Sequence, residues 1–285
     1  MITHDKFQEI ETEVERCIYS ILDKIKNTSP KNYCLLLANG EYNEFPNNDI
    51  HKFNPHVIDD NSWDKITNTR TKFLTNFLNT FYAFPDEQSV EDDEIRMHIE
   101  LMIYSHIWES KSFLKQLYRL AHILFENKYV WNVSIPDFRK HDFIRDDIQK
   151  SFESQEHTMF QIIKNGFHSS LRNAFAHSEY YFMGTNIHLT NYKGREWEIQ
   201  DITFSDWSIR FVYSVLLSYN LIKYINVCRK NIIQDLGTNI FVIDLPSSKG
   251  VIREEKIVYN KNTDMFSFER NVVDTWEAVD NWCKE

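Results

Sequence analysis

The sequence predicts a mainly α protein, a helical bundle with an inserted β-hairpin and small α/β flanking regions. Apolar residues recur at helical spacing over several long stretches, which is the pattern of helices that bury one face. Gly and Pro are scarce, at six each, which disfavours a turn-rich all-β fold and long linkers. With 285 residues, 42% of them hydrophobic, the chain can bury a sizeable core.

The N-terminal part, residues 1–90, is expected to be an α/β or helical accessory region. Residues 4–26 predict a first helix, and the apolar run "YCLLLANG" (33–40) predicts a short buried strand that ends at Gly40. After a polar, proline-containing segment, residues 62–84 predict another helix. No internal repeat links this part to the rest of the chain.

The central part, residues 91–233, is expected to be the helical domain. The acidic stretch "PDEQSVEDDE" comes before it, and Ser89 with Asp92 suggests a capping box, an explanation we favour over metal binding. Apolar positions at helical spacing predict one helix over 95–127, and a second long helix follows over 142–177.

An alternating pattern follows the second long helix. Ile187 and Leu189, then the turn "NYKG", then Trp197 and Ile199 predict a β-hairpin. Either of the two polar residues in "FSDW" is expected to cap the next long helix, that is Ser205 or Asp206.

That last long helix contains the most apolar stretch of the chain, "FVYSVLLSYNLIKYINV". Asn220, Lys223 and Asn226 interrupt it, so a buried core helix is favoured over a membrane span. In the C-terminal part, residues 234–285, strand-like runs over 238–270 precede an expected terminal helix.

Charge and cysteine content exclude several functions. The net charge of −10 is unlike a general nucleic-acid binder, so an RNA substrate would need a local basic pocket. Four dispersed cysteines without a CxxC pair suggest neither a zinc site nor a disulfide framework. His51, His56, Asp59 and Asp60 lack a recognised metal-ligand spacing, so no metal is expected. The charged N-terminus does not resemble a signal peptide, which makes the cytoplasm the default location.

The stretch "LRNAFAHSEYYF" (171–182) carries the strongest chemical signal. Arg172 and His177 are five residues apart, about 140° around a helix, so they share a cleft only where the helix ends near His177. Asn173 lies four residues before His177 and shares its face. A cationic anchor and an imidazole are the groups that metal-free cleavage of a phosphodiester needs. A helix-end cap or a salt-bridge pair would also fit these residues.

"LRNAFAHS" resembles the signature of the HEPN superfamily (higher eukaryotes and prokaryotes nucleotide-binding). In these α-helical domains the end of one core helix carries R-x4-6-H, commonly with a polar residue after the arginine. Arg172, Asn173 and His177 match that pattern. The preceding helix with "YSHIWESKSF" and the following hairpin and long helix are also similar, so the resemblance covers residues 91–233.

The resemblance implies a metal-independent endoribonuclease that needs no cofactor and acts as a toxin or abortive-infection effector in antiviral defence. His177 would act as general base or acid, and Arg172 would bind the scissile phosphate. Asn173 would orient His177 or contact the phosphate. The products would carry a 2′,3′-cyclic phosphate and a 5′-hydroxyl. Because the family pairs two such domains, a homodimer with a composite site is implied, together with an antitoxin or defence-system partner.

Further residues near the motif are weaker candidates. His168 could contact RNA, although a partly exposed helix histidine is the simpler interpretation. Glu109, in "WESK", resembles a residue that some family members point at the site, and a surface acid is the alternative. Lys193 and Arg195 in the hairpin could contact RNA phosphates. The cluster "FRKHDFIR" could do so as well, but a solvated helix start is favoured.

Tyr180 is a candidate supporting residue. In antitoxin-paired relatives a tyrosine two places after the histidine is a modification target, and here that place is taken by Glu179. A non-catalytic HEPN-like module that binds RNA, a nucleotide or a protein partner is the rival function, and the acidic net charge favours it.

Overall fold

The computed structural model describes residues 2–42, 56–58, 61–84, 89–154, 156–246 and 251–269. It is mainly helical, as the sequence predicts. Its helices in chain order are α1 (His4–Thr28), α2 (Pro30–Leu37), α3 (Asn61–Phe81), α4 (Glu94–Glu109), α5 (Lys111–Glu126), α6 (Lys140–Asp142), the π-helical segment Phe143–Gln149, α7 (Lys150–Glu153), α8 (His157–Gly166), α9 (Ser169–Ala176) and α10 (Phe204–Leu236).

The strands are short and pair only in antiparallel fashion. They are β1 (Ile2–Thr3), β2 (Glu41–Tyr42), β3 (His56–Val57), β4 (Ser89–Val90), β5 (Tyr180–Met183), β6 (Asn186–Leu189), β7 (Asp201–Thr203), β8 (Ile240–Pro246), β9 (Ile252–Asn260) and β10 (Met265–Phe268). β1 pairs with β4 and β2 with β3, and the others form the sheets β5–β6–β7 and β8–β9–β10.

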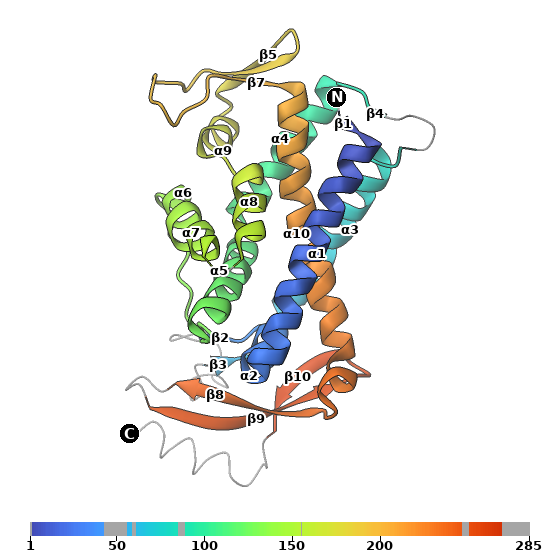
Figure 1. The fold of residues 1–285 in the computed structure, drawn as a ribbon, viewed down its shortest axis with the longest axis vertical. Helices are drawn as coiled ribbons and strands as arrows, with labels where there is room; N and C mark the ends of the chain where they lie inside the picture. Colours follow the sequence, from blue (N-terminus) through green and yellow to red (C-terminus); the bar gives the residue numbers. More distant parts are fainter. Residues whose placement is uncertain are drawn as a thin grey trace.

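Helix α10 is the axis of the bundle and runs almost its whole length (Figure 1). Helices α1, α3, α4 and α8 pack against it. Residues 211–218 are buried at every position, so the helix is covered on all sides there. α10 has the length and apolar composition that could cross a membrane, but 56% of its most apolar window is buried inside the bundle. The structure therefore favours the core-helix interpretation.

One hydrophobic core includes residues from all three parts of the chain. Helix α1 contributes an apolar stripe that recurs every three or four residues, formed by Phe7, Ile10, Val14, Cys17, Ile18, Ile21, Leu22 and Ile25. α4 and α10 contribute from the centre of the chain, and Phe241, Ile257 and Phe266 from the C-terminal strands. The described residues of the segments 1–90, 91–233 and 234–285 thus pack together around one core.

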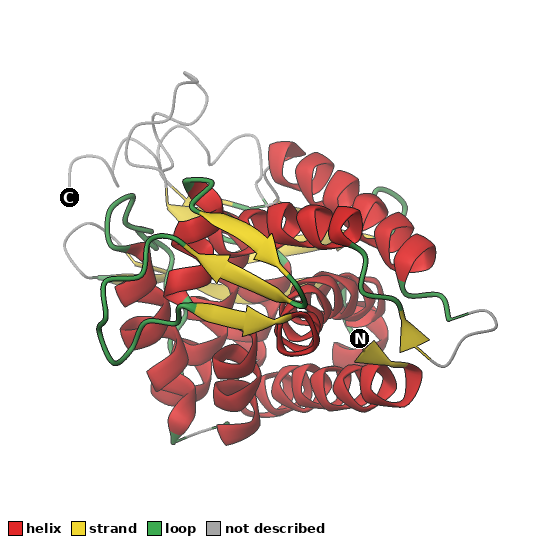
Figure 2. Cartoon of the chain, turned by 90° about the horizontal axis from the view of Figure 1, so that it is seen from above, coloured by secondary structure: helices red, strands yellow, loops and turns green. Residues whose placement is uncertain are grey.

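The two three-stranded sheets lie at opposite ends of the bundle (Figure 1). β8–β10 lie beside α2, and β5–β7 lie beside α9 and the start of α10. Figure 2, which views the molecule from the β5–β7 end, shows that sheet across the helix ends. The strand-like runs predicted over 238–270 are confirmed, while the expected terminal helix lies outside the described residues.

Two predictions for the N-terminal part differ in outcome. The helices over 4–26 and 62–84 are confirmed as α1 and α3. The strand over 33–40 is wrong, because these residues belong mostly to helix α2. Pro30 occupies the first turn of α2, where its missing N–H costs nothing. The run is buried on every side, so its apolar pattern could not distinguish a strand from a helix.

The single helix expected over 95–127 is two helices, α4 and α5. Ser110 separates them in an extended conformation (ψ 105°), and its hydroxyl accepts a hydrogen bond from the Phe113 N–H at 3.5 Å. The expected capping box is also wrong. Ser89 lies in β4, and Asp93 caps α4 by accepting from the Ile95 and Arg96 N–H groups.

The helix expected over 142–177 is divided into several pieces. The sharpest break comes after Gly166, where Phe167 and His168 adopt extended conformations before α9 begins. A Cβ on Gly166 would meet the Ser214 hydroxyl at 3.0 Å and Trp108 at 3.4 Å. A larger residue at position 166 would therefore require these neighbours on α10 and α4 to shift by a few tenths of an ångström.

The expected hairpin exists with different strands. β5, β6 and β7 form a three-stranded meander in which Ile187 lies opposite Ile202 and Phe182. Trp197 and Ile199 lie in the connection between β6 and β7, not in a strand. Helix α10 is capped by Thr203, whose hydroxyl accepts from the Asp206 N–H at 3.1 Å, so neither predicted cap is correct.

Candidate active site at the end of helix α9

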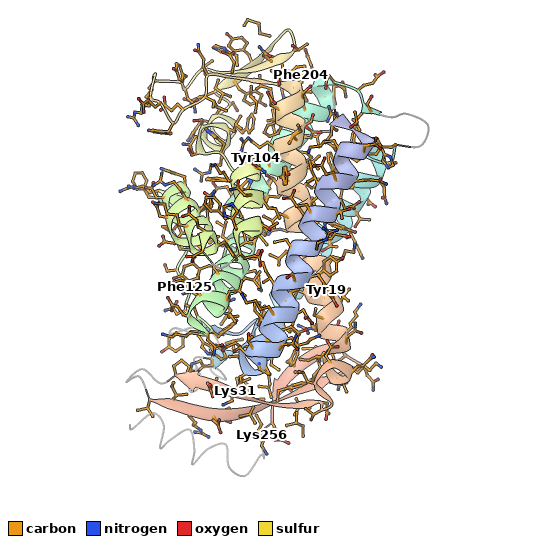
Figure 3. All side chains as sticks on the ribbon, in the orientation of Figure 1. Tyr19, Lys31, Tyr104, Phe125, Phe204 and Lys256 are labelled. Atoms are coloured by element: carbon orange, nitrogen blue, oxygen red, sulfur yellow. The ribbon has the colours of Figure 1, made fainter. Side chains whose placement is uncertain are left out.

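Helix α9 begins with a capping histidine that is fixed to α4. Nδ1 of His168 accepts a hydrogen bond from the Ser170 N–H at 3.2 Å. The Tyr104 hydroxyl accepts from the His168 N–H at 2.8 Å and donates to its carbonyl at 3.3 Å. Figure 3 labels Tyr104 in this part of the bundle. Burial, with a contribution from Arg210, lowers the pKa of His168 to about 4, so at neutral pH His168 would meet RNA as an uncharged ring.

Helix α9 ends where the spacing of the motif requires. His177 is the C-cap, with φ −111° and ψ 5°, and Ser178 follows in the left-handed region with φ 56°. The Ser178 N–H donates to the Phe175 carbonyl at 3.2 Å. The Glu179 N–H donates to the Ala174 carbonyl at 2.7 Å. These two bonds form a Schellman motif, and the expectation that the helix stops at His177 is confirmed.

Arg172 extends from α9 toward α4. Its guanidinium forms an ion pair with Glu109 and donates a hydrogen bond to Oδ1 of Asn173 at 2.9 Å. The Arg172 side chain is 17% exposed, and burial lowers its pKa although Tyr104 acts in the opposite direction. Because a guanidinium in a protein stays protonated, Arg172 presents a fixed positive charge that is mostly buried and partly exposed.

Glu109 also holds a second cation. Its other carboxylate oxygen accepts from Nζ of Lys140, which is 5% exposed. Burial lowers the pKa of Lys140. One carboxylate therefore lies between two positive charges and connects α4, α6 and α9. The structure brings Glu109 to Arg172, as the resemblance implies.

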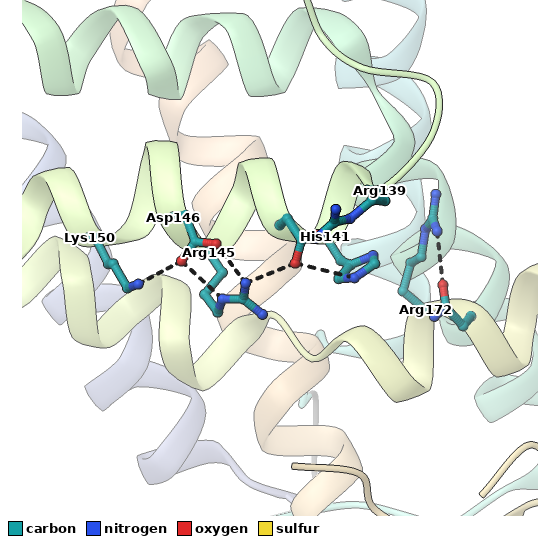
Figure 4. A network of polar contacts seen from close by, with 8 residues as sticks. Arg139, His141, Arg145, Asp146, Lys150 and Arg172 are labelled. Carbon is teal, nitrogen blue, oxygen red and sulfur yellow. Dashed lines mark hydrogen bonds and ion pairs between the residues drawn. The ribbon is translucent and has the colours of Figure 1, made fainter. Parts of the chain in front are cut away.

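The other basic residues near α6 are neutralised by their neighbours. Arg139 pairs with Asp142 at 2.5 Å, and Arg145 pairs with Asp142 at 2.8 Å and with Asp146 at 2.6 Å. Figure 4 shows this chain of contacts and Arg172 beside it. In this arrangement "FRKHDFIR" is an ion-paired helix start, which is the interpretation that the sequence favoured. Within the described residues, Glu109 pairs with Lys140 from this cluster and with Arg172 from α9.

His177 lies at the open end of the site. Its side chain is exposed, and no contact from the described residues holds its ring. Asn173 is linked to His177 only through the backbone, by the His177 N–H donating to the Asn173 carbonyl at 3.2 Å. The Asn173 amide oxygen instead accepts from Arg172. The Asn173 side chain is thus bonded to the arginine, while the histidine side chain is exposed to solvent.

Tyr180 lies one step beyond the motif, in β5. Its hydroxyl is 3.0 Å from Nδ1 of His98 on α4, and its ring meets Phe175 edge-on with centroids 4.9 Å apart. Phe175 in turn packs against Trp207 at 5.3 Å. Tyr180 therefore connects the end of α9 to α4 and α10, a supporting position.

Lys193 and Arg195 lie apart from the motif, in the exposed connection between β6 and β7. The Lys193 N–H donates to the Glu198 carboxylate at 2.7 Å, and the Arg195 guanidinium lies 5.5 Å from the centre of the Trp197 ring. Among the described residues no contact joins this loop to Arg172 or His177. Their role in RNA binding stays a prediction.

Sequence reasoning missed Tyr104 and Lys140 as parts of the site. Tyr104 is fully buried, and its hydroxyl needs a partner, which it finds at the start of α9. "YSHIWE" places Tyr104 and Trp108 four residues apart on one helix face, which signals a buried aromatic pair but not its partner. Lys140 lay within the basic cluster but could not be linked to Glu109 without the fold.

Across the described part of the chain, no group of three or more His, Cys, Asp or Glu side chains is arranged to hold a metal ion. His56, one of the residues weighed as a ligand, is 1% exposed and packs edge-on against Trp131 with ring centroids 4.8 Å apart. The other three, His51, Asp59 and Asp60, lie outside the described residues.

Comparison with known proteins adds no relative. The chain matches no family model, and no curated protein or solved structure shows significant similarity to it.

Proposed function

We propose that the protein is a metal-independent endoribonuclease of the HEPN type, with its active site at the end of α9. The observation that carries this proposal is that α9 stops at His177. A continuous helix would turn Arg172 and His177 to different sides. The Schellman ending instead leaves an exposed imidazole close in sequence to a half-buried guanidinium held by Glu109 and Asn173.

In this proposal Arg172 binds the scissile phosphate and stabilises the charge that develops on it. His177 takes the proton from the ribose 2′-hydroxyl or returns one to the leaving oxygen. In-line attack by the 2′-oxygen breaks the bond to the 5′-oxygen, which leaves a 2′,3′-cyclic phosphate and a 5′-hydroxyl. Asn173 keeps the guanidinium oriented through its hydrogen bond.

Glu109 gives the site a resting state. Its carboxylate occupies the position on Arg172 that a phosphate oxygen would take. Lys140 remains beside Glu109 and can neutralise it when RNA displaces it from the arginine. Because Arg172 then has an anionic partner both before and after RNA binds, its charge is never left unpaired. An acidic protein can in this way accept an RNA phosphate at one local position.

The proposal also includes a homodimer, a cellular location and a biological role. Two copies of the chain would bring two motifs to one cleft, because a single motif supplies one histidine and one arginine. We place the enzyme in the cytoplasm as a toxin or antiviral defence effector, with an antitoxin or another defence component as its regulator.

The test is cleavage of total or transfer RNA in EDTA by the purified protein, with Arg172→Ala and His177→Ala beside it. His157→Ala, an exposed histidine on α8, is the matched control. We expect the wild type and the control to cut and to leave 5′-hydroxyl ends that polynucleotide kinase labels directly. Each site variant should lose on the order of a hundredfold or more in rate.

A second function is favoured by the Glu109–Arg172 ion pair and by the net charge of −10. In this alternative the protein is a non-catalytic module that binds RNA, a nucleotide or a protein partner through the same surface. Binding of labelled RNA without cleavage, weakened by Arg172→Ala but not by His177→Ala, would support this alternative and contradict the enzyme.

A further inference from the structure

We propose that the protein binds one molecule of a long-chain carboxylate, a free fatty acid in chemical class, in a cavity on the side of the bundle. This cavity lies between α2, α3, α4, α5 and α10 and has a volume of about 580 Å³. Ligand sites in proteins typically have volumes of roughly 300–1,000 Å³ and are lined mostly by apolar side chains. The proposal does not depend on the ribonuclease function.

The walls of the cavity are mainly aliphatic and aromatic side chains from several helices: Leu36, Leu37, Phe73, Leu74, Ile99, Met102, Ile103, Ile107, Phe113, Leu221, Ile222 and Ile225. Phe73 and Met102 are 52% and 59% exposed, so they mark the mouth. Exposed apolar side chains of this size at a cavity mouth favour an apolar occupant.

One end of the cavity is polar and positively charged. Arg70 of α3 donates hydrogen bonds to the Ser110 hydroxyl at 2.5 Å and to the Ser112 hydroxyl at 3.2 Å, both on the opposite wall. The guanidinium has five N–H groups, and only part of them is used by these bonds. No Asp or Glu is among the described residues that line the cavity.

The second arginine on the wall has a structural role. Arg229 is held by Asp264 and by the carbonyl of Leu37. Arg70 is therefore the lining arginine whose neighbours are hydroxyls and not a carboxylate. In a protein with a net charge of −10, a cation placed at the end of an apolar cavity without an acidic partner favours an anionic head group.

A cavity of this volume accepts a single molecule, so a free fatty acid is favoured over a bilayer surface. The experiment is titration of the purified full-length protein with dodecanoate, dodecanol and acetate, followed by native mass spectrometry and by displacement of a fluorescent apolar probe. Phosphatidylcholine vesicles serve as the membrane arm. We expect one equivalent of dodecanoate to bind saturably, dodecanol to bind at least tenfold more weakly, and acetate and vesicles not to bind.

Two kinds of variant test the geometry. Arg70→Gln should weaken dodecanoate at least tenfold and leave dodecanol nearly unchanged, whereas Lys72→Gln removes a charge from the same helix outside the cavity and should change neither. Ser218→Phe fills the cavity from α10 and should abolish binding. If it does not fold, Ile222→Trp does the same from a half-buried position.

The proposal is overturned by an absence of saturable dodecanoate binding, or by equal binding of dodecanoate to the folded cavity-filling variant. It is also overturned if Arg70→Gln leaves the preference for dodecanoate over dodecanol unchanged. Binding to vesicles but not to monomeric dodecanoate would also overturn it, because the occupant would then be a membrane.

Discussion

Helix α4 carries two glutamates that each pair with an arginine, and the two pairs differ in almost every other respect. Glu100 pairs with Arg96 one turn earlier on the same helix, and both are buried, at 0% and 2% exposure. Glu109 pairs with Arg172 from another helix, and both side chains are partly exposed. The first pair lies in the core and the second at the candidate active site.

The Glu100 carboxylate of the buried pair has three hydrogen-bond donors, whereas Nε and Nη2 of Arg96 are buried without a hydrogen bond among the described residues. Besides Arg96, Glu100 accepts from the Tyr82 hydroxyl at 2.5 Å and from Trp207 Nε1 at 2.8 Å. Burial nevertheless raises the pKa of Glu100, although all three partners lower it. An enclosed carboxylate with three donors has no place for a ligand, so this pair fixes how α4, α10 and the Tyr82 region pack.

The exposed pair has capacity left. Arg172 is 17% exposed, and Glu109 is about one third exposed and shared with Lys140. The comparison teaches that an arginine–glutamate contact alone does not identify a site. The Glu109–Arg172 pair differs in being partly exposed and in lying on the helix that ends at the exposed His177.

The largest expected effect is on the buried pair. Glu100→Gln leaves the buried Arg96 charge with Asp92, 3.8 Å away and partly exposed, as its remaining counter-ion, so we expect the free energy of unfolding to fall by about 3 kcal/mol. Urea denaturation followed by circular dichroism measures this change. The double variant Arg96→Met with Glu100→Met removes both charges and should recover part of this loss, because the Tyr82 hydroxyl and the Trp207 N–H are still left without their acceptor.

That prediction separates charge from packing. If Glu100→Gln costs less than about 1 kcal/mol, the buried pair is not holding the core and the contrast with Glu109 is lost. If the double variant is as unstable as the single one, the loss comes from packing around Trp207 and not from an uncompensated charge.

The second effect concerns His168. Its ring is largely buried, as the Arg96–Glu100 pair is, although it lies at the start of the helix that carries the candidate site. Its folded pKa is about 4, below the ordinary 6.5, because burial disfavours the charged ring. The unfolded chain therefore binds the proton more readily. His168 contributes its full stability above about pH 6.5, and this contribution is lost as the pH falls toward 4, by up to about 3 kcal/mol.

His168→Asn isolates this contribution, because an asparagine oxygen can cap α9 in place of Nδ1. The unfolding free energy of the wild type should fall more steeply between pH 6.5 and pH 4 than that of the variant. Parallel curves would show that His168 does not titrate with folding. An exposed histidine, as in His157→Asn, should leave the slope unchanged.

The sequence predicted the parts of this molecule that depend on local signals. The helix over 4–26 and the end of α9 at His177 follow from apolar spacing and from the geometry of a five-residue offset. The prediction failed for a short run that is buried on all sides, as in α2, because the alternation of apolar and polar residues disappears when every face is covered. The helix breaks at Ser110 and Gly166 were not predicted, because the residues that contact these two positions come from other helices.

The candidate site was predictable to the same extent. Arg172, Asn173 and His177 are adjacent in sequence, so a motif could name them. Glu109 came only with the resemblance. Lys140 could not be linked to it at all, because its contact joins α6 to α4 through the fold.

The third effect is at the end of α9 itself. Ser178 holds a left-handed conformation, φ 56°, which costs a residue with a Cβ roughly 1–2 kcal/mol. Glycine avoids this strain but loses more backbone entropy on folding, so only part of the cost is recovered. Ser178→Gly should therefore raise the unfolding free energy by about 0.5–1 kcal/mol. Ser151→Gly, inside the helical segment α7, should lower it by a similar amount.

The smallest effect on stability, and the sharpest test of the comparison, is Glu109→Gln. Its carboxylate is about one third exposed, so solvent screening limits the cost to roughly 1 kcal/mol or less. On the proposed function, removing this anion from Arg172 favours an RNA phosphate there, so the cleavage rate at low RNA concentration should rise several-fold. Glu126→Gln, which removes the charge of an exposed glutamate beside the half-buried His122 on α5, should change neither quantity. A large loss of stability would place Glu109 with the buried pair, and unchanged cleavage by a stable variant would show that Glu109 does not compete with the substrate for Arg172.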